Sequence, residues 1–376
     1  MKKSILFLIN LDTFFVSHRL DIGKKLLDLG YEVHVACKFI KYEKKLLNLG
    51  FKIHKINFKR KSFDLINFIG SIISILIILL KIKPQILHIV SIRSIVLGGL
   101  ASLFTSVNSI VFSITGIGSI YIQSSFSSKI RFYIVNFLLK IIFKKTNSKK
   151  VFIFQNKDDL KFFKKLAKIK RKDYFLIKGS GIKINKNNKY LKIQNKVPKV
   201  LMASRLIADK GVYEYIDAAK LCRKLKLNFE FLLIGDTDPG NPSNINIKKI
   251  KKLHKQKILK YFPYQNNILK FIRKSSVVVL PSYREGFPKV LIEAASQGRP
   301  VITTNVPGCR DAVVNRKTGL LIPAKNSTIL AKTIIKLSSN KKLLNQMGKN
   351  SLKYAKKNFN INDVVYKHIK IYQRLF

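Results

Sequence analysis

Two carboxylates near the start of the last quarter of the chain lie in a segment whose other residues are typical of a phosphate-binding site. Glu285 and Glu293 are separated by seven residues. Gly286 lets the backbone approach a ligand closely, and Pro288 suits the first turn of a helix. Free backbone N–H groups at a helix start attract anions, and Lys289 is unfavourable for the helix itself unless an anion binds there. The segment therefore predicts a site for a diphosphate.

Glu293 carries the most information in this segment, because its sequence neighbours are apolar. A carboxylate in such surroundings is costly unless it finds hydrogen-bond donors, and the two hydroxyls of a ribose would supply them. The structural alternative is that Glu285 caps the helix and Glu293 forms an ordinary ion pair. We favour the ligand interpretation, because the whole chain has only 19 Asp and Glu residues.

The elements that must position this segment are short apolar, β-branched runs that alternate with longer helical stretches. Such alternation indicates parallel sheets covered by helices on both faces. The expected strands are Ser4–Ile9, Glu32–Ala36, Ile53–Ile56, Ile86–Val90, Ser109–Ile114, Val151–Gln155, Tyr174–Lys178, Lys199–Ala203, Phe229–Gly235, Ile258–Phe262, Val277–Leu280 and Val301–Thr304. The expected helices include His18–Leu29, Ile130–Lys144, Gly211–Leu225 and Asn360–Phe376.

The strand and helix pattern restarts after Pro198, which predicts two α/β domains of the Rossmann-like type. We expect an N-terminal domain over 1–182, a linker rich in Lys and Asn over 183–197, and a second domain over 198–358. The last helix, 359–376, is expected to pack back on the N-terminal domain. Ligands of open α/β sheets bind at the carboxyl ends of the strands. We therefore place the chemistry in loops that face a cleft between the two domains.

Composition narrows the class of protein. The chain of 376 residues is 47% hydrophobic, which excludes a disordered chain. Its net charge of +54 attracts phosphates, nucleic acid or anionic lipid. The coding bias of an AT-rich genome, which favours Lys, Ile and Asn, accounts for part of that excess. Lysines are dispersed through both domains and form no basic stripe, so a nucleic-acid-binding protein is a remote alternative.

The spacing of the cysteines and the short apolar run at the N-terminus indicate a reducing, cytoplasmic compartment. Cys37, Cys222 and Cys309 are odd in number and far apart, which argues against a disulfide framework and against a structural zinc. The apolar run at the N-terminus is too short for a signal peptide and is a better first buried strand.

Two segments bear on membrane contact. Leu65–Leu80 is almost wholly apolar, but its sixteen residues fall short of the ~20 that span a bilayer. We interpret it first as a core helix, with a membrane-dipping helix as the alternative. Arg131–Lys145 interleaves aromatic residues with lysines. It either docks on an anionic membrane or forms a core helix with a solvated basic face.

A metal site is not expected. Asp236 and Asp238 stand two residues apart, as carboxylates that hold Mn or Mg do. The Pro-Gly-Asn-Pro stretch that follows indicates turns, and basic residues already offer the positive charge that a metal would bring. We therefore predict neither a metal nor a cofactor.

The Glu–seven–Glu segment resembles the signature of retaining glycosyltransferase family 4, the group 1 glycosyltransferases. The resemblance implies the GT-B architecture, in which two Rossmann-like domains enclose an interdomain cleft. Three further motifs are similar to those of this family: Ala203-Ser204-Arg205-Leu206 through Asp209-Lys210-Gly211, Phe231-Leu232-Leu233-Ile234-Gly235-Asp236, and Thr318-Gly319-Leu320-Leu321-Ile322-Pro323.

A narrower resemblance covers the first domain. It is to enzymes that build bacterial O-antigen, capsule or protein-linked glycans, among them N-acetylgalactosaminyltransferases that act on undecaprenyl-diphosphate-linked sugars. The segments that carry it are Asp12–Leu20, Ile114–Gly118, Gln155–Asp159 and Asp236–Pro242. The chain departs from many members by having Asn10-Leu11-Asp12-Thr13 in place of a Gly-rich loop, and Thr115-Gly116 in place of a donor-contacting histidine.

The resemblance implies an enzyme peripheral on the cytoplasmic face of the inner membrane. It would move a hexose or N-acetylhexosamine from a nucleotide diphosphate sugar, UDP favoured, to a polyprenyl-diphosphate-linked acceptor with retention of configuration. Arg205 and Lys210 would hold the diphosphate and stabilise the leaving group. Glu285 would face the donor sugar, and Glu293 would bind the ribose. The other implied donor-site residues are Gly235, Gly286, Phe287, Pro288, Lys289 and Val290.

Contacts to the acceptor or the cleft are assigned to Asp12, His18, Thr115 and Gly116. For His18, a surface histidine at a helix start is an equal alternative. A nucleotide-sugar epimerase of the same architecture is the alternative function, and it would need no acceptor. The pairing of two cations with two carboxylates favours transfer.

Overall fold

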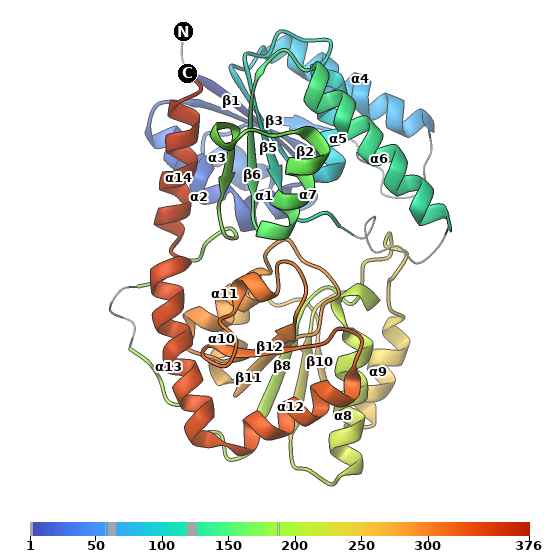
Figure 1. The fold of residues 1–376 in the computed structure, drawn as a ribbon, viewed down its shortest axis with the longest axis vertical. Helices are drawn as coiled ribbons and strands as arrows, with labels where there is room; N and C mark the ends of the chain where they lie inside the picture. Colours follow the sequence, from blue (N-terminus) through green and yellow to red (C-terminus); the bar gives the residue numbers. More distant parts are fainter. Residues whose placement is uncertain (1–2, 57, 59–64, 119–125, 186, 188) are drawn as a thin grey trace. The chain divides into compact units, whose positions relative to one another are not determined.

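The computed structural model describes residues 3–56, 58, 65–118, 126–185, 187 and 189–376. The chain divides into two compact units, each an α/β body built on one parallel sheet (Figure 1). Unit 1 contains Met1–Ser180 and Ile361–Phe376, and unit 2 contains Gly181–Asn360. Residues 186 and 188 of the expected linker lie outside the described residues.

Unit 1 holds a seven-stranded sheet in the order β3-β2-β1-β4-β5-β6-β7, with parallel pairing throughout. The order reverses between β1 and β4, which is where open α/β sheets leave room for ligands beyond the strand ends. All seven strands overlap their predicted positions. They are β1 (Ser4–Leu11), β2 (Glu32–Lys38), β3 (Lys52–Lys55), β4 (Ile86–Val90), β5 (Ser109–Ile114), β6 (Lys149–Phe154) and β7 (Tyr174–Leu176).

Helices cover both faces of this sheet. The helix predicted over His18–Leu29 is confirmed as α2, which begins only at Leu20 because Arg19 has a non-helical φ of −131°. An additional short helix, which was not predicted, begins at Asp12. The helices are α1 (Asp12–His18), α2 (Leu20–Asp28), α3 (Glu43–Asn48), α4 (Leu65–Ile82), α5 (Ile92–Ser102), α6 (Phe126–Lys145), α7 (Lys157–Ala167) and α14 (Ile361–Gln373).

Alternate residues of β1 divide between two hydrophobic clusters, as the two-residue period of a strand requires. Leu6 and Leu8 belong to the cluster that includes residues of α4, α5 and α6. Ile5 and Phe7 belong to the other cluster, which includes residues of α2 and α14. The last helix is fixed there by a buried hydrogen bond between the Tyr372 hydroxyl and His88 Nδ1 at 2.6 Å.

The structure overturns the interpretation of the apolar helix α4 as a core helix. Only Ser71, Ile75 and Leu79 are buried along its length. By length and composition α4 could cross a membrane, and only 17% of its 18 residues are buried. In α6, Val135, Leu139, Ile142 and Phe143 are buried, whereas several other apolar side chains and several lysines are exposed.

Unit 2 holds a six-stranded parallel sheet in the order β10-β9-β8-β11-β12-β13. Five strands overlap their predictions. The edge strand β13 lies within the motif Thr318–Pro323 and was not predicted as a strand, because a run of four residues between turns is too short to show a clear period. The strands are β8 (Lys199–Ala203), β9 (Glu230–Ile234), β10 (Lys260–Phe262), β11 (Val277–Leu280), β12 (Val301–Thr304) and β13 (Gly319–Ile322).

Helices alternate with strands in unit 2 as far as β12, and the last two helices of the unit follow β13. The helices are α8 (Val212–Lys224), α9 (Ile247–Lys255), α10 (Ile268–Lys274), α11 (Lys289–Ser296), α12 (Ser327–Ser339) and α13 (Lys341–Asn358), with 3-10 turns η3 (Ala208–Lys210) and η4 (Arg310–Ala312). The helix predicted to open near Pro288 is confirmed as α11, and the one predicted over Gly211–Leu225 is confirmed as α8.

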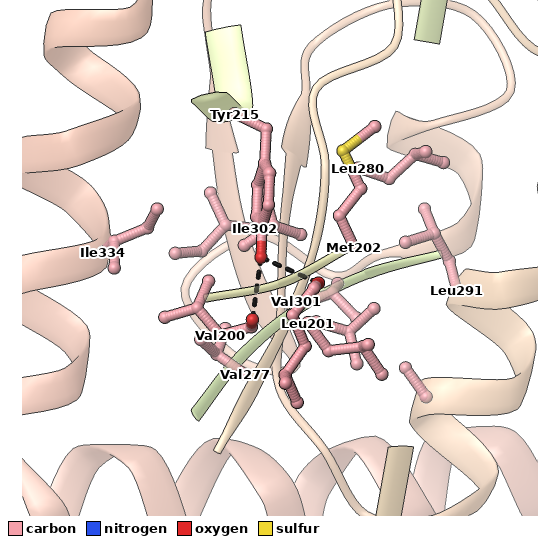
Figure 2. Packing of buried hydrophobic residues seen from close by; sticks show 14 of the residues in the cluster. Val200, Leu201, Met202, Tyr215, Val277, Leu280, Leu291, Val301, Ile302 and Ile334 are labelled. Carbon is pink, nitrogen blue, oxygen red and sulfur yellow. Dashed lines mark hydrogen bonds between the residues drawn. The ribbon is translucent and has the colours of Figure 1, made fainter. Parts of the chain in front are cut away.

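The core of unit 2 is held around one buried tyrosine. Tyr215 of α8 is fully buried, and its hydroxyl donates to the carbonyls of Val200 in β8, at 2.8 Å, and Leu232 in β9, at 2.9 Å (Figure 2). The phenol therefore ties α8 to two central strands. Burial raises the pKa of Tyr215 well above its usual value, so the hydroxyl keeps its proton.

We expect Tyr215→Phe to lower the free energy of unfolding by roughly 1–3 kcal/mol, because two buried carbonyls lose their shared donor. Urea unfolding followed by circular dichroism would measure the change. Tyr213→Phe on the same helix is the matched control, since Tyr213 is 43% exposed and should change stability little. Equal stability of the two variants would contradict the expected role.

Candidate functional site

The charged residues that the sequence analysis assigned to a diphosphate site lie at the carboxyl edge of the unit 2 sheet. β8 and β11 are neighbours at the point where the strand order reverses. The loop after β8 carries Arg205 and Lys210, and the loop after β11 carries Glu285. Parallel strands present their carboxyl ends at one edge, so the topology gathers residues that are far apart in the sequence.

An ion pair joins these two loops. Lys210 Nζ donates to Glu285 Oε1, and the two side chains are only 17% and 12% exposed. The backbone supports the contact: Tyr283 N–H donates to the Asp209 carbonyl at 2.9 Å, and the Ser282 hydroxyl donates to the same oxygen at 3.1 Å. The structure thus brings together two residues that the sequence assigned to one site.

Arg205 is held by Asp238, a residue that the sequence analysis considered only as a metal ligand. Its Nη1 donates to Asp238 Oδ2 at 2.6 Å. Asp238 is 6% exposed while Arg205 is 53% exposed, so a buried carboxylate anchors a guanidinium that remains open to solvent. The signal was present in principle, because β9 is the neighbour of β8 and the loop after β9 carries Asp238.

The loop after β9 folds along the loop after β8. Leu206 N–H donates to the Asp236 carbonyl, and Ala208 N–H donates to the Ser243 carbonyl, both at 2.8 Å. Gly235 allows the approach: its φ is +144°, and a Cβ there would lie 1.8 Å from the Ser204 carbonyl oxygen. Any other residue at this position would push the Arg205 loop away.

Asp236 and Asp238 are engaged separately. Asp238 pairs with Arg205, whereas Asp236 Oδ1 accepts the Tyr264 N–H at 3.1 Å. Within the described ranges, no three His, Cys, Asp or Glu residues come together as a metal site. The expectation that the protein works without a metal stays a prediction.

A third loop supports Glu285. Its backbone N–H donates to the Pro307 carbonyl at 3.1 Å. Gly308 has a φ of +79°, and a Cβ there would lie 2.3 Å from the Glu285 carbonyl oxygen. The pKa of the Cys309 thiol is raised to about 12, mainly by burial and to a smaller extent by the negative charge of Glu285, so this cysteine stays neutral.

The start of α11 contributes backbone rather than side chains. Pro288 is the residue that precedes the helix, and Lys289 is its first residue, one position later than the sequence suggested. Gly286 and Pro288 are buried, and Val290 is half-buried. Phe287 is 7% exposed and packs edge-on against Phe359 with ring centroids 5.6 Å apart, so its side chain belongs to the core.

Glu293 lies in apolar surroundings, as the sequence predicted. Its side chain is 14% exposed, with Lys289 Nζ 3.9 Å from Oε1. Burial raises the pKa of Glu293 to about 7, and the Lys289 charge opposes that rise. Near neutral pH the group therefore exists in both protonation states.

Another missed contact lies behind the Glu285 loop. The Tyr283 hydroxyl donates to Glu214 Oε1 at 2.6 Å, which links this loop to the first turn of α8. Burial, with the nearby Glu214 carboxylate, raises the pKa of Tyr283 and keeps its hydroxyl protonated. Nothing in the sequence spacing pointed to this pair.

In unit 1, Asp12 requires a correction. It was expected to contact an acceptor, but it is fully buried. Its oxygens accept the backbone N–H groups of Thr13, at 2.7 Å, and of the three residues from Ile40 to Tyr42, at 2.6–3.0 Å. The carboxylate organises the loop after β2 and has no oxygen left for an acceptor.

The remaining unit 1 candidates stay predictions. His18 ends α1, half-buried and stacked on Phe14 with ring centroids 4.1 Å apart, and its Nδ1 lies 2.6 Å from the Ser17 hydroxyl. Thr115 and Gly116 follow β5 directly and are half-buried. All three follow strands of the sheet at its carboxyl edge.

Comparison with known proteins gives the same assignment for both halves of the chain. Residues 183–354 match the model of the glycosyl transferases group 1, and residues 4–156 match that of a glycosyl transferase 4-like domain.

Two curated relatives span more than two thirds of this chain and of their own length. One is the N,N'-diacetylbacillosaminyl-diphospho-undecaprenol alpha-1,3-N-acetylgalactosaminyltransferase of Campylobacter jejuni, 29% identical over 274 residues, which covers 70% of this chain and 69% of that protein. The other is the UDP-Gal:alpha-D-GlcNAc-diphosphoundecaprenol alpha-1,3-galactosyltransferase of Escherichia coli, 26% identical over 311 residues, which covers 80% and 78%.

The fold is also that of solved enzymes. The sucrose-phosphate synthase of Thermosynechococcus elongatus superposes with a TM-score of 0.81 at 17% identity, covering 100% of this chain and 99% of that one. The predicted GT-B fold class is confirmed. Both halves of the sequence and the fold agree: the chain is a glycosyltransferase that joins a glycosyl transferase 4-like domain over residues 4–156 to a group 1 glycosyl transferase domain over residues 183–354.

Proposed function

We propose that this glycosyltransferase moves a hexose or N-acetylhexosamine from a UDP-sugar to a polyprenyl-diphosphate-linked glycan, with retention of anomeric configuration. The observation that carries the proposal is the gathering of Arg205, Lys210 and Glu285 at the carboxyl edge of the unit 2 sheet. The names of the two relatives support the acceptor class, and the Escherichia coli name supports UDP as the donor base.

On binding, the donor diphosphate would take the place of a protein carboxylate as the partner of a cationic side chain. Lys210 is paired with Glu285 in the structure, and a bound diphosphate competes for the same ammonium group. The exchange would leave Glu285 beside the sugar, where it stabilises positive charge at the anomeric carbon. Arg205 and Lys210 would then stabilise the charge that develops on the leaving UDP. The backbone N–H groups at the start of α11 would add to this stabilisation.

We assign Glu285 an electrostatic role in a same-face substitution rather than the role of a covalent nucleophile. Its Oε1 already accepts a hydrogen bond from Lys210, and both side chains are largely buried. A carboxylate held by an ammonium group is a weaker nucleophile than a free one, because its charge is partly neutralised. Glu293 would accept hydrogen bonds from the ribose hydroxyls.

The acceptor class implies work at a membrane surface. The chain carries a net charge of +54, and each Lys or Arg near an anionic leaflet contributes about 1 kcal/mol of attraction. We therefore propose peripheral association with the cytoplasmic face of an anionic inner membrane, with no nucleic-acid partner.

The donor site can be tested with a panel of UDP- and GDP-sugars and no acceptor. We expect slow release of UDP from one UDP-sugar, and a loss of roughly 10²–10³-fold in Glu285→Ala and in Lys210→Ala, because charge stabilisation disappears. Lys220→Ala is the control, since Lys220 forms an exposed pair with Asp217 on the surface of α8. Full activity in Glu285→Ala would overturn the site assignment.

The raised pKa of Glu293 predicts that affinity for the UDP-sugar depends on pH. Its pKa of about 7 means that the free protein binds a proton below neutral pH, whereas the ribose contact needs the carboxylate. Affinity for the UDP-sugar should therefore rise as the pH increases from 5.5 through about 7, and then level off. Calorimetry should use the UDP-sugar and not UDP, whose terminal phosphate titrates near pH 6 itself.

Glu293→Gln should bind the UDP-sugar weakly and with no such pH dependence, since the amide does not titrate. Glu230→Gln is a matched control, because Glu230 begins β9 at the opposite end of that strand from Gly235. An unchanged pH profile in Glu293→Gln would show that another group titrates.

Asp238 should act through Arg205. We expect Asp238→Asn to raise the KM for the donor by about tenfold, because the guanidinium loses its anchor, and to have little further effect in an Arg205→Ala background. Full kinetics of the two single variants and the double variant would measure this coupling, with Asp217→Asn as a surface control.

We expect the transferase activity to survive treatment with EDTA. Additive losses in the double variant, or inactivation by EDTA, would favour a metal role for Asp238 instead.

A further inference from the structure

One face of α4 exposes a row of aliphatic side chains. Ile69 is 47% exposed, Ile73 50%, Ile77 59% and Leu80 50%. Their spacing of three or four residues places them on one side of the helix. These four residues define the outer face of α4. Large exposed apolar patches on soluble proteins mark sites of interaction.

The opposite face of α4 is fixed to unit 1. Ser71, Ile75 and Leu79 are buried, and Ile75 and Leu79 belong to the hydrophobic cluster beneath the sheet. The helix also packs against α5. A helix that is apolar on all sides needs cover on all sides, and here protein covers only one. Because its inner face is held by the core, α4 cannot cross a membrane without carrying the unit with it.

We infer that the outer face of α4 docks into an anionic lipid bilayer, with the helix lying in the membrane plane. The inference rests on the proposed function and deepens it, since it names the element that meets the lipid. Interfacial helices bury their apolar side at the boundary between headgroups and acyl chains. Ile69, Ile73, Ile77 and Leu80 would reach that boundary.

Charge around the face fits anionic headgroups. α4 contains no acidic residue, and Lys81 and Lys83 stand exposed at its C-terminal end. The helix α6, which also packs against α5, lacks acidic residues as well and exposes Lys129, Lys140, Lys144 and Lys145. Apolar insertion combined with basic flanks is the two-signal arrangement that gives stable peripheral binding.

Lipid fits this face better than protein does. Protein interfaces are enriched in aromatic residues and carry about one hydrogen bond per 100–200 Å². The outer face of α4 is aliphatic, and the nearby Ser74 hydroxyl donates to the Gly70 carbonyl of its own helix at 2.8 Å. A second copy of the chain is disfavoured as the partner, because two molecules with a net charge of +54 repel each other.

The chain has no tryptophan, which permits a single-site reporter of depth. Ile73→Trp in the full-length protein should shift its emission to shorter wavelength on addition of phosphatidylcholine vesicles that contain phosphatidylglycerol, and brominated acyl chains should quench it. Leu225→Trp is the control, since Leu225 lies in unit 2 with a similar exposure of 54%. Equal behaviour of the two reporters would overturn the inference.

Vesicle flotation supplies the second arm. Ile73→Glu combined with Ile77→Glu should weaken binding by roughly tenfold or more, whereas Leu191→Glu combined with Leu225→Glu adds the same charge elsewhere and should change it far less. Equal losses would mean that charge alone controls binding and would overturn the docking face. Circular dichroism and thermal melting would verify that the variants fold.

Two further readouts separate the alternatives. Sedimentation without vesicles tests for a second copy: a dimer that dissociates in the Ile73→Glu and Ile77→Glu variant would overturn lipid docking. Release of UDP from a soluble donor should be the same in wild type and in this variant, because the face lies outside the donor site. Vesicle binding by a protein that releases no UDP would count against the proposed function and leave the docking inference standing.

Discussion

Charged side chains that are nearly closed off from water must find partners, and this constraint shapes the carboxyl edge of the unit 2 sheet. Lys210 and Glu285 satisfy it for each other, and their contact ties together the loops after the two strands where the sheet order reverses. Replacing such a pair by apolar residues often costs no stability. The arrangement is better understood as a means of holding a cation and an anion ready for a ligand that carries charge of its own.

Glu293 is also largely buried, but it has no such close ion pair in the part of the chain that the structure describes. The ammonium nitrogen of Lys289 lies 3.9 Å from its Oε1, and burial raises the pKa of Glu293 to about 7. A carboxyl whose folded pKa exceeds its unfolded value stabilises the protein at low pH, and that stability is lost as the pH rises through about 7. Retaining an acid there costs stability at neutral pH, which is understandable if ribose hydroxyls supply the missing donors in the bound state.

The alternation of apolar runs was enough to predict both parallel sheets and the helix after Pro288, because buried parallel strands and helix stops leave strong local signals. Local signals could not show what depends on tertiary pairing. Asp238 was considered only as a metal ligand, although the strand order places its loop beside Arg205. Asp12 was assigned to an acceptor, yet its oxygens are occupied by backbone amides some thirty residues away. Both carboxylates serve partners that no spacing rule reveals.

The helix α4 marks a different limit of sequence reasoning. An apolar residue raises the same expectation of burial whether protein or hydrocarbon covers it, so composition alone favoured a core helix. Only the folded structure separates the two cases, because it shows that Ile75 and Leu79 face protein while Ile73 and Ile77 do not. Water is the costly neighbour for such a row of side chains. The acceptor that we propose carries a polyprenyl tail, which would bring hydrocarbon within reach of this helix. The apolar surface that is unfavourable in water would then hold the enzyme beside its substrate.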